Sequence, residues 1–296
     1  MTKLRGLAAV SVAALALSVA PVSAATSDPY RAQQWGLDRI QAEQAWPVST
    51  GVGATVAVVD TGVDLSHPDL AANIVSYPDA DMVEPNGTCT KAPGKNGART
   101  CTQDGAQDKN GHGTHVAGIV AAVTNNGVGV AGVAPGAKVL PVRVLDAEGS
   151  GTTDQIASGI RYAADKGAKV INLSLGFLSG VGEVVRVTGG LNPVYSAIDY
   201  AWSKGAVIVF AAGNDSVPLC AEPAAHPKVL CVGSTNRNDV RSWFSNGDAT
   251  LTKYYVMAPG GEALTCAGDI LSTYLRGAAT YCAEDGYEAL AGPSMA

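Results

Sequence analysis

The chain has 296 residues, of which 47% are hydrophobic and 16% are charged, and its formal net charge is -6. This composition is apolar enough to bury a core, which excludes a disordered chain. Its basic residues form no cluster or stripe, which argues against a nucleic-acid partner. The 35 glycines against 3 phenylalanines favour tight turns and small-residue packing, as in α/β enzymes whose sites are built from loops.

The first 25 residues are predicted to be a secretory signal peptide. A basic start precedes an apolar run over residues 7–20, and Val22-Ser23-Ala24 offers small residues at a cleavage point. A membrane anchor is the alternative, but the run is shorter than the roughly 20 apolar residues that span a bilayer. No later stretch is long and apolar enough to span one. We therefore expect residues 26–296 to form one extracellular, secreted domain.

Apolar, β-branched runs alternate with helical patterns along the chain. The runs predict strands buried on both faces, at 55–59, 139–145, 169–175, 206–210 and 229–232. The helical patterns lie at 115–123, 153–166 and 194–204, and a glycine follows each of the last two. This order predicts an α/β fold with a parallel sheet. The segments 77–110 and 216–228 are predicted to be surface loops held by disulfides.

Six cysteines agree with an oxidising compartment. Fifteen pairings are possible, and the sequence-local ones are favoured: Cys89 with Cys101, Cys220 with Cys231, and Cys266 with Cys282. No C-x-x-C motif occurs, so the cysteines do not favour a structural zinc site or a redox motif.

Two polar residues follow predicted strands, at the sheet edge where parallel sheets bind ligands. Asp60 follows the run 55–59 and, taken alone, is a turn residue beside Thr61 and Gly62. Asn214 follows the run 206–210. It is either a turn former or an amide that donates to a developing oxyanion.

His112 and His115 lie in the segment G-H-G-T-H-V-A-G. His112 is predicted to start a helix, with His115 one turn on and facing the sheet. A zinc site is disfavoured because zinc hydrolases of this type carry H-E-x-x-H, so a buried, hydrogen-bonded His115 is the favoured interpretation. Ser294 lies in G-P-S-M-A, which matches a nucleophile elbow only in part because Ala296 replaces its second glycine.

Four segments in chain order resemble the motifs of the subtilisin-like serine proteases, or subtilases. They are V-V-D-T-G at 58–62, H-G-T-H-V-A-G at 112–118, A-A-G-N at 211–214 and G-x-S-M-A at 292–296. The acid, histidine and serine also follow the order of the subtilisin triad. The resemblance covers residues 28–296. It implies a three-layer α/β fold, with a mainly parallel sheet between helices, and a secreted serine endopeptidase.

The resemblance implies a role for each matching residue. Ser294 would attack the peptide carbonyl to form an acyl-enzyme, His112 would take its proton, and Asp60 would orient His112. Asn214 and the Ser294 N–H would hold the oxyanion. The implied substrate-binding residues are Ser174, Leu175, Gly176, Gly149, Ser150, Gly151, Ala211, Ala212 and Gly213. We expect a monomer that acts on proteins or peptides and binds neither nucleic acid nor membrane.

The segment 123–130 resembles the calcium loop of thermitase-like subtilases. The implied ligands are all oxygens, as calcium requires. They come from the side chains of Asp28, Asp69 and Asn126 and from the carbonyls of Val123, Val128 and Val130. An ordinary Asn-Gly turn is the alternative.

The sequence ends two residues after Ser294, where the family continues into a long central helix and further structure. We therefore expect the peptidase domain to lack its C-terminal helix and tail, either as a fragment of a longer gene or as a truncated product. A second hypothesis follows, in which the chain is a non-catalytic remnant that retains peptide-binding strands.

Overall fold

The computed structural model describes residues 26–85, 88–91, 99–102, 104–176, 186–188, 190–247, 249 and 253–296, with the backbone alone at 88–91, 99–102 and 186–188. The predicted signal peptide at 1–25 lies outside the described residues. Within the described ranges, no helix has both the length and the apolarity needed to cross a bilayer.

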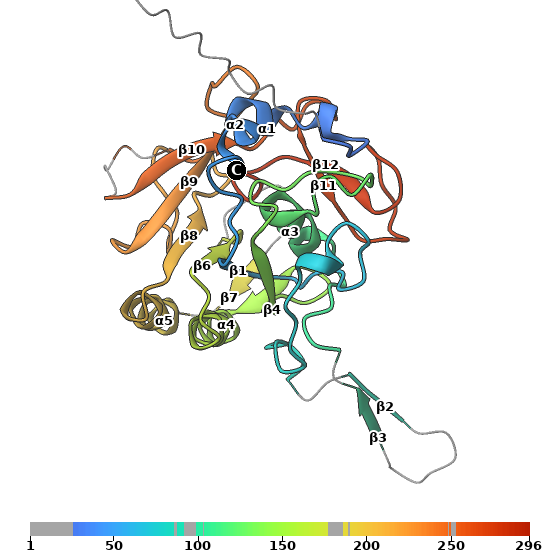
Figure 1. Cartoon of the computed structure of the whole chain (residues 1–296). Helices are drawn as coiled ribbons and strands as arrows, with labels where there is room; N and C mark the ends of the chain where they lie inside the picture. Colours follow the sequence, from blue (N-terminus) through green and yellow to red (C-terminus); the bar gives the residue numbers. More distant parts are fainter. Residues whose placement is uncertain are drawn as a thin grey trace, which may run out of the picture.

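A six-stranded parallel sheet forms the centre of the molecule (Figure 1). The strand order is β10-β9-β8-β6-β1-β4. The strands are β1 (Thr55–Asp60), β4 (Lys138–Arg143), β6 (Val170–Leu173), β8 (Val207–Ala211), β9 (Val229–Thr235) and β10 (Tyr255–Pro259). The predicted parallel sheet is confirmed. The edge strand β10 was not predicted, because it is partly exposed and lacks a continuous buried apolar run.

Helices cover both faces of the sheet, as predicted. Ala57 and Val59 of β1 pack into the core under α4 (Thr153–Asp165) and α5 (Asn192–Ser203). Val58, between them, packs on the opposite face against α3 (His112–Ala121). Side chains alternate between the faces of a strand, so β1 is buried on both sides and carries two cores.

The helix ends follow local chemistry. Thr152 and Gln155 form a capping box at the start of α4. Gly167 and Gly205 follow the ends of α4 and α5 with φ of +80° and +83°, the left-handed conformation that glycine adopts without strain. The helix α3 begins at His112, as predicted, and ends at Ala121, within the apolar pattern at 115–123. Its polar first turn is held by the Asp108 carboxylate, which accepts the Thr114 N–H.

Smaller elements complete the fold. They are η1 (Arg31–Gln33), α1 (Trp35–Arg39), α2 (Ala42–Ala45), η2 (Ala71–Asn73), and the pairs β2 (Thr88–Lys91) with β3 (Arg99–Thr102), β5 (Ser150–Thr152) with β7 (Arg186–Thr188), and β11 (Ile270–Thr273) with β12 (Tyr287–Leu290). The segment 77–110, predicted to be a surface loop held by a disulfide, carries an element that was not predicted, the antiparallel β2–β3 hairpin, which projects away from the body (Figure 1).

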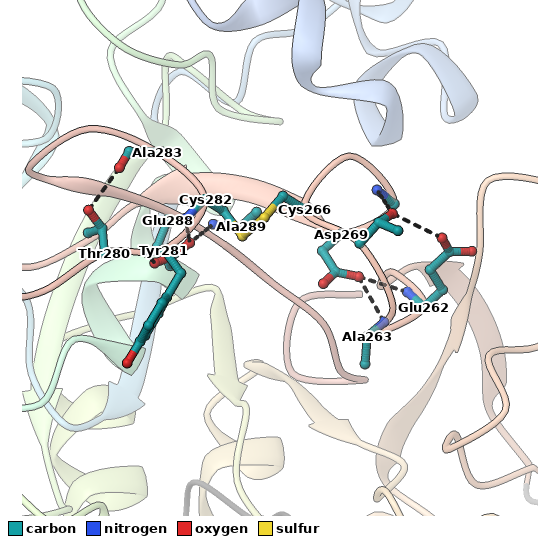
Figure 2. Close-up of a disulfide and its surroundings, with 12 residues drawn as sticks. Glu262, Ala263, Cys266, Asp269, Thr280, Tyr281, Cys282, Ala283, Glu288 and Ala289 are labelled. Atoms are coloured by element: carbon teal, nitrogen blue, oxygen red, sulfur yellow. Dashed lines mark hydrogen bonds between the residues drawn. A yellow bond between two sulfur atoms is a disulfide. The ribbon is translucent and has the colours of Figure 1, made fainter.

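Two of the predicted disulfides form, Cys220–Cys231 and Cys266–Cys282. The backbones of Cys89 and Cys101 face each other across β2 and β3, but their side chains lie outside the described residues. Figure 2 shows Cys266–Cys282 beside the buried Glu288 carboxylate, which accepts the backbone N–H of Cys282 at 3.0 Å.

Candidate active site

The candidate site lies at the carboxyl edge of three neighbouring strands. Asn214 follows β8, and Ser174 follows β6, the next strand in the sheet. Asp60 is the last residue of β1, which lies on the other side of β6. Parallel strands end at the same edge of a sheet, so residues far apart in the sequence meet there. Sheet order alone therefore brings these segments together.

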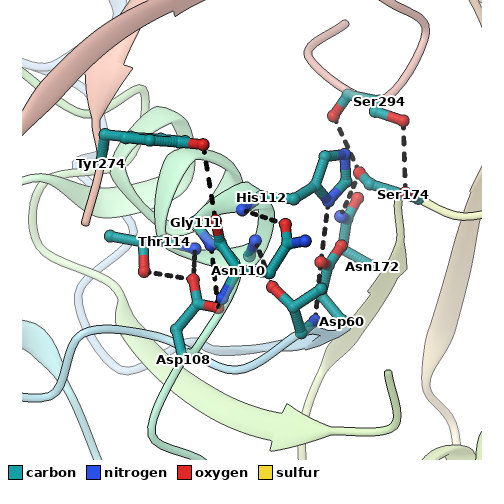
Figure 3. Close-up of polar contacts among 12 residues, drawn as sticks. Asp60, Asp108, Asn110, Gly111, His112, Thr114, Asn172, Ser174, Tyr274 and Ser294 are labelled. Carbon is teal, nitrogen blue, oxygen red and sulfur yellow. Dashed lines mark hydrogen bonds and ion pairs between the residues drawn. The ribbon is translucent and has the colours of Figure 1, made fainter. Parts of the chain in front are cut away.

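Asp60 and His112 form a buried pair (Figure 3). Nδ1 of His112 lies 2.8 Å from Oδ1 of Asp60. Because a carboxylate accepts hydrogen bonds, we assign the proton to Nδ1, which leaves Nε2 unprotonated and able to act as a base. The second Asp60 oxygen, Oδ2, is buried and has no partner among the described residues.

The surroundings of His112 favour its charged form. Burial by itself lowers the pKa of this imidazole, but the charge and hydrogen bond of Asp60, together with the charge of Asp108, raise it above its ordinary value of 6.5. Asp108 is itself buried and also caps α3. Two carboxylates therefore act on His112, and the sequence reasoning identified only one of them.

The Asp60–His112 pair depends on a close approach of α3 to β1. A Cβ on Gly113 would collide with the Gly62 carbonyl and would lie 3.1 Å from Cβ of Asp60. Only glycine leaves this space free. The glycine after His112 is thus explained by packing.

Ser294 lies on the other side of His112 in Figure 3. Its Oγ donates to the Ser174 carbonyl at 3.2 Å, and the Ser174 hydroxyl donates to the Ser294 carbonyl at 2.8 Å. Within the described residues, Ser294 Oγ makes no hydrogen bond to His112. The structure therefore brings Asp60 and His112 into contact and holds Ser294 against Ser174, the residue that follows β6.

Asn214 faces the segment that carries Ser294. Its Oδ1 lies 3.7 Å from the position of a Cβ built on Gly292. The Asn214 side chain is half-buried and makes no hydrogen bond among the described residues. Its amide is thus free to donate to a group that arrives beside Ser294.

His115 is buried and hydrogen-bonded, and it faces a different partner from the predicted one. Its Nε2 lies 3.0 Å from the Ile270 carbonyl and 3.1 Å from the Glu288 carbonyl, so it contacts β11 and β12 where the sequence reasoning placed it on the central sheet. Burial and the charge of His112 lower its pKa to about 3. Both carbonyls accept hydrogen bonds, which identifies Nε2 as the protonated nitrogen and disfavours a zinc ligand.

The predicted substrate-binding residues lie on three segments near this edge. Ser174, Leu175 and Gly176 follow β6, and the segment 211–213 ends β8, its direct neighbour in the sheet. The segment 149–151 enters β5, where a Cβ on Gly151 would collide with the Val144 carbonyl after β4.

The predicted calcium residues meet at the loop 123–130. The Asp28 carboxylate accepts the Asn126 N–H at 3.1 Å, and Asp69 accepts the Asn126 side-chain amide at 2.8 Å and the Val130 N–H at 2.8 Å. Both carboxylates are buried, and neither forms an ion pair within the described part of the chain. Burial, with the charge of Asp28 adding to it, raises the pKa of Asp69 to about 6.

Known proteins resemble this chain over most of its length. A sequence profile of the subtilase family matches residues 51–296. Thermitase of Thermoactinomyces vulgaris is 42% identical over 271 residues, which cover 91% of this chain and 80% of thermitase. Subtilisin Savinase of Lederbergia lenta is 39% identical over 227 residues, 76% of this chain and 71% of the relative.

The fold has solved counterparts as well. The structure of a protease from Pseudoalteromonas arctica superposes with a TM-score of 0.71 and 35% identity, covering 92% of this chain and 83% of that one. These similarities define a serine-type endopeptidase and favour it over a non-catalytic protein. The chain belongs to the subtilase family.

Proposed function

We propose that Asp60, His112 and Ser294 carry out peptide-bond hydrolysis. The observation that carries this assignment is the 2.8 Å contact between Asp60 Oδ1 and His112 Nδ1, with both side chains buried. In the proposed reaction, Ser294 Oγ would leave the Ser174 carbonyl, to which it donates at 3.2 Å, and donate to His112 Nε2. Nε2 then takes the hydroxyl proton as Oγ attacks the substrate carbonyl, and Asp60 stabilises the resulting imidazolium.

The Asn214 amide and the Ser294 backbone N–H are proposed to hold the oxyanion of the tetrahedral intermediate. Support comes from the Asn214 side chain, which lies near Gly292 and makes no hydrogen bond among the described residues. The proton on His112 then passes to the leaving amine, and water hydrolyses the acyl-enzyme with His112 again as the base. A donor directed at the developing oxyanion typically contributes about 3 kcal/mol to lowering the barrier.

The substrate is proposed to be an extended peptide or protein segment. Residues 149–151 and 174–176 would pair with its backbone, and residues 211–213 would line the pocket for the side chain before the cleaved bond. Support comes from their position on neighbouring segments at the carboxyl edge of the sheet.

The loop 123–130 is proposed to hold a structural Ca²⁺ ion. The donor set fits a hard cation, since the carboxylates of Asp28 and Asp69 are buried without a cationic partner among the described residues. The side chain of Asn126 and the carbonyls of Val123, Val128 and Val130 would complete the oxygen ligands. A bound ion would neutralise these carboxylates and fix the loop.

We propose that the protein is secreted through cleavage of residues 1–25 and acts as a monomer. Two disulfides among the described residues agree with an oxidising compartment.

Labelling with a fluorophosphonate probe tests the assignment of Ser294, because the probe reacts only with an activated serine. We expect stoichiometric labelling of Ser294, located by mass spectrometry of the tryptic peptide. The Ser294→Ala variant should take no label and hydrolyse no peptide, while keeping the wild-type circular dichroism spectrum. Absence of label on a folded wild-type protein would favour the non-catalytic alternative.

A further inference from the structure

Asn246 is buried beneath the segment that presents Asn214. It lies in the chain between β9 and β10, with none of its surface exposed. Nothing in the local sequence marks it, because it is 32 residues away from Asn214 in the chain (246 minus 214). The mechanism proposed above does not use it.

The Asn246 side chain satisfies backbone groups on both sides of Asn214. Its Nδ2 donates to the Ala212 carbonyl at 3.0 Å. Its Oδ1 accepts the Asp215 N–H at 2.8 Å and the Val217 N–H at 3.2 Å. Its own backbone N–H donates to the Gly213 carbonyl at 2.9 Å. The peptide groups before and after Asn214 are therefore held by a single residue.

The fit between Asn246 and this segment is close. Gly213 has a φ of +104°, and a Cβ there would lie 2.5 Å from Asn246 Nδ2. Ser216 also adopts a left-handed φ of 59°, which is uncommon outside glycine. Its N–H donates to the Phe244 carbonyl at 2.9 Å, so the turn that carries Asn246 also holds this strained residue.

Asn246 is itself fixed to the central sheet. The neighbouring Ser245 hydroxyl donates to the Asn246 carbonyl at 2.9 Å and accepts the Ser234 N–H of β9 at 2.9 Å. Both serines are fully buried. A continuous set of hydrogen bonds thus runs from β9 through Asn246 to the segment 212–217.

We propose that Asn246 is a positioning residue for catalysis, which holds the amide of Asn214 at the oxyanion through the backbone of residues 212–217. This inference rests on the proposed role of Asn214. The Asn214 side chain has no hydrogen bond of its own among the described residues, so its direction is set by its backbone. A shift of about 1 Å at a catalytic group can cost 10²-fold in rate.

A double-mutant cycle tests the proposal. Asn214→Ala, Asn246→Ala and the double variant are compared with the wild type by kcat and KM on a chromogenic peptide, per titrated active site. We expect Asn214→Ala to lower kcat by about 10²- to 10³-fold. Asn246→Ala should lower kcat by about 10- to 10²-fold in the wild type. In the Asn214→Ala background, Asn246→Ala should lower kcat by less than about threefold, because the effects of residues that act as a unit are not additive.

Further variants separate positioning from general destabilisation. Asn246→Asp keeps the acceptor for the Asp215 and Val217 N–H groups but loses the donor to the Ala212 carbonyl and to the Asp215 carboxylate, and it places a negative charge beside both. It tests the same non-additivity if Asn246→Ala does not fold. The matched control is Asn73→Ala, another buried asparagine, whose Nδ2 donates to the carbonyls of Ala121 and Pro135. It should lower the melting temperature without changing kcat.

The outcomes are distinct. Equal losses of kcat from Asn246 variants with and without Asn214, or no loss at all, would overturn the positioning role. An unchanged kcat in Asn214→Ala would instead remove the oxyanion role on which the inference rests. A loss of kcat in Asn73→Ala as large as in Asn246→Ala would show that the loss of kcat comes from general destabilisation, and would also overturn the proposal.

Discussion

The two ring nitrogens of His112 have different surroundings, and that difference sets the proton chemistry of the candidate site. Nδ1 is held by Asp60, while Nε2 makes no hydrogen bond among the described residues. Asp108 lies at the start of the same helix and acts on the ring through its charge. His115 adds no second positive charge near His112, because its lowered pKa keeps it neutral near pH 7.

This arrangement predicts how activity depends on pH. His112 must be neutral to act as a base, so a pKa raised above 6.5 places the acid-side loss of kcat/KM above pH 6.5. Asp108→Asn removes one of the two carboxylates that raise this pKa and should move the midpoint to lower pH. Initial rates at low substrate concentration between pH 5 and about 9 would measure it.

The control for this prediction is Asp199→Asn, which makes the same change in net charge at an exposed carboxylate of α5, paired with Lys228. Its midpoint should equal that of the wild type. A wild-type midpoint at or below 6.5, or equal shifts in both variants, would contradict the assignment.

At the scale of elements, α3 is held against the β11–β12 hairpin by buried polar contacts. His115 donates to both strands, and the hydroxyls of Ser272 and Thr273 on β11 donate to the carbonyls of His115 and Thr114, each at 2.8 Å. Since α3 starts with His112, the hairpin also supports the candidate base.

The neutral His115 predicts acid sensitivity of the fold. Its pKa is about 3 when folded and 6.5 when unfolded, so between these values the unfolded state binds more protons. The contribution of neutral His115 to the free energy of unfolding is complete above pH 6.5 and falls as the pH decreases towards 3, by up to about 1.4 kcal/mol per pH unit. Urea unfolding should show that the free energy of unfolding decreases less from pH 7 to pH 5 in His115→Gln than in the wild type. Equal losses would refute the linkage.

The loop 123–130 predicts a response to calcium. A chelator should lower the melting temperature, and calcium at 100 times its Kd should restore about 2.7 kcal/mol. Asp69→Asn should reduce this response because it removes the charge of a buried carboxylate that is proposed as a ligand. Differential scanning calorimetry would measure both, with Asp154→Asn, at the first turn of α4, as the control. A melting temperature that changes with neither chelator nor calcium would contradict the calcium site proposed at the loop 123–130.

At the scale of the whole molecule, the two disulfides of the described residues crosslink segments that support the candidate site. Cys231 lies in β9, and Cys220 follows the segment 212–217. Cys266 precedes β11, and Cys282 precedes β12, the hairpin that holds α3. Both crosslinks therefore stabilise regions that bear on the chemistry.

Removing Cys266–Cys282 should destabilise the protein by about 3 kcal/mol, because the two cysteines are 16 positions apart and the open chain gains entropy when unfolded. The test is urea unfolding of the double variant Cys266→Ser/Cys282→Ser. Wild-type protein under reducing conditions loses Cys220–Cys231 as well, so its midpoint should lie at or below that of the oxidised double variant. A loss below 1 kcal/mol would contradict the estimate from chain entropy.

Much of the fold could be predicted because its signals are local. The runs at 55–59 and 206–210 mark strands by apolar continuity, and Gly167 and Gly205 mark helix ends by backbone freedom. The motifs around Asp60, His112, Asn214 and Ser294 carried the family assignment in the same way. Each signal lies within a few residues of the feature it predicts.

Contacts between distant segments could be seen only in the tertiary structure. The sequence by itself determined the parallel sheet, its helices and the family, since periodicity, turn residues and motifs are written along the chain. Tertiary structure alone decided that Asp108 would cap α3 and act on His112, that His115 would face β11 and β12, and that Asn246 would hold the segment of Asn214. The physical reason is that buried polar groups must find hydrogen-bond partners wherever the fold brings them, and sequence spacing does not specify which partner that is.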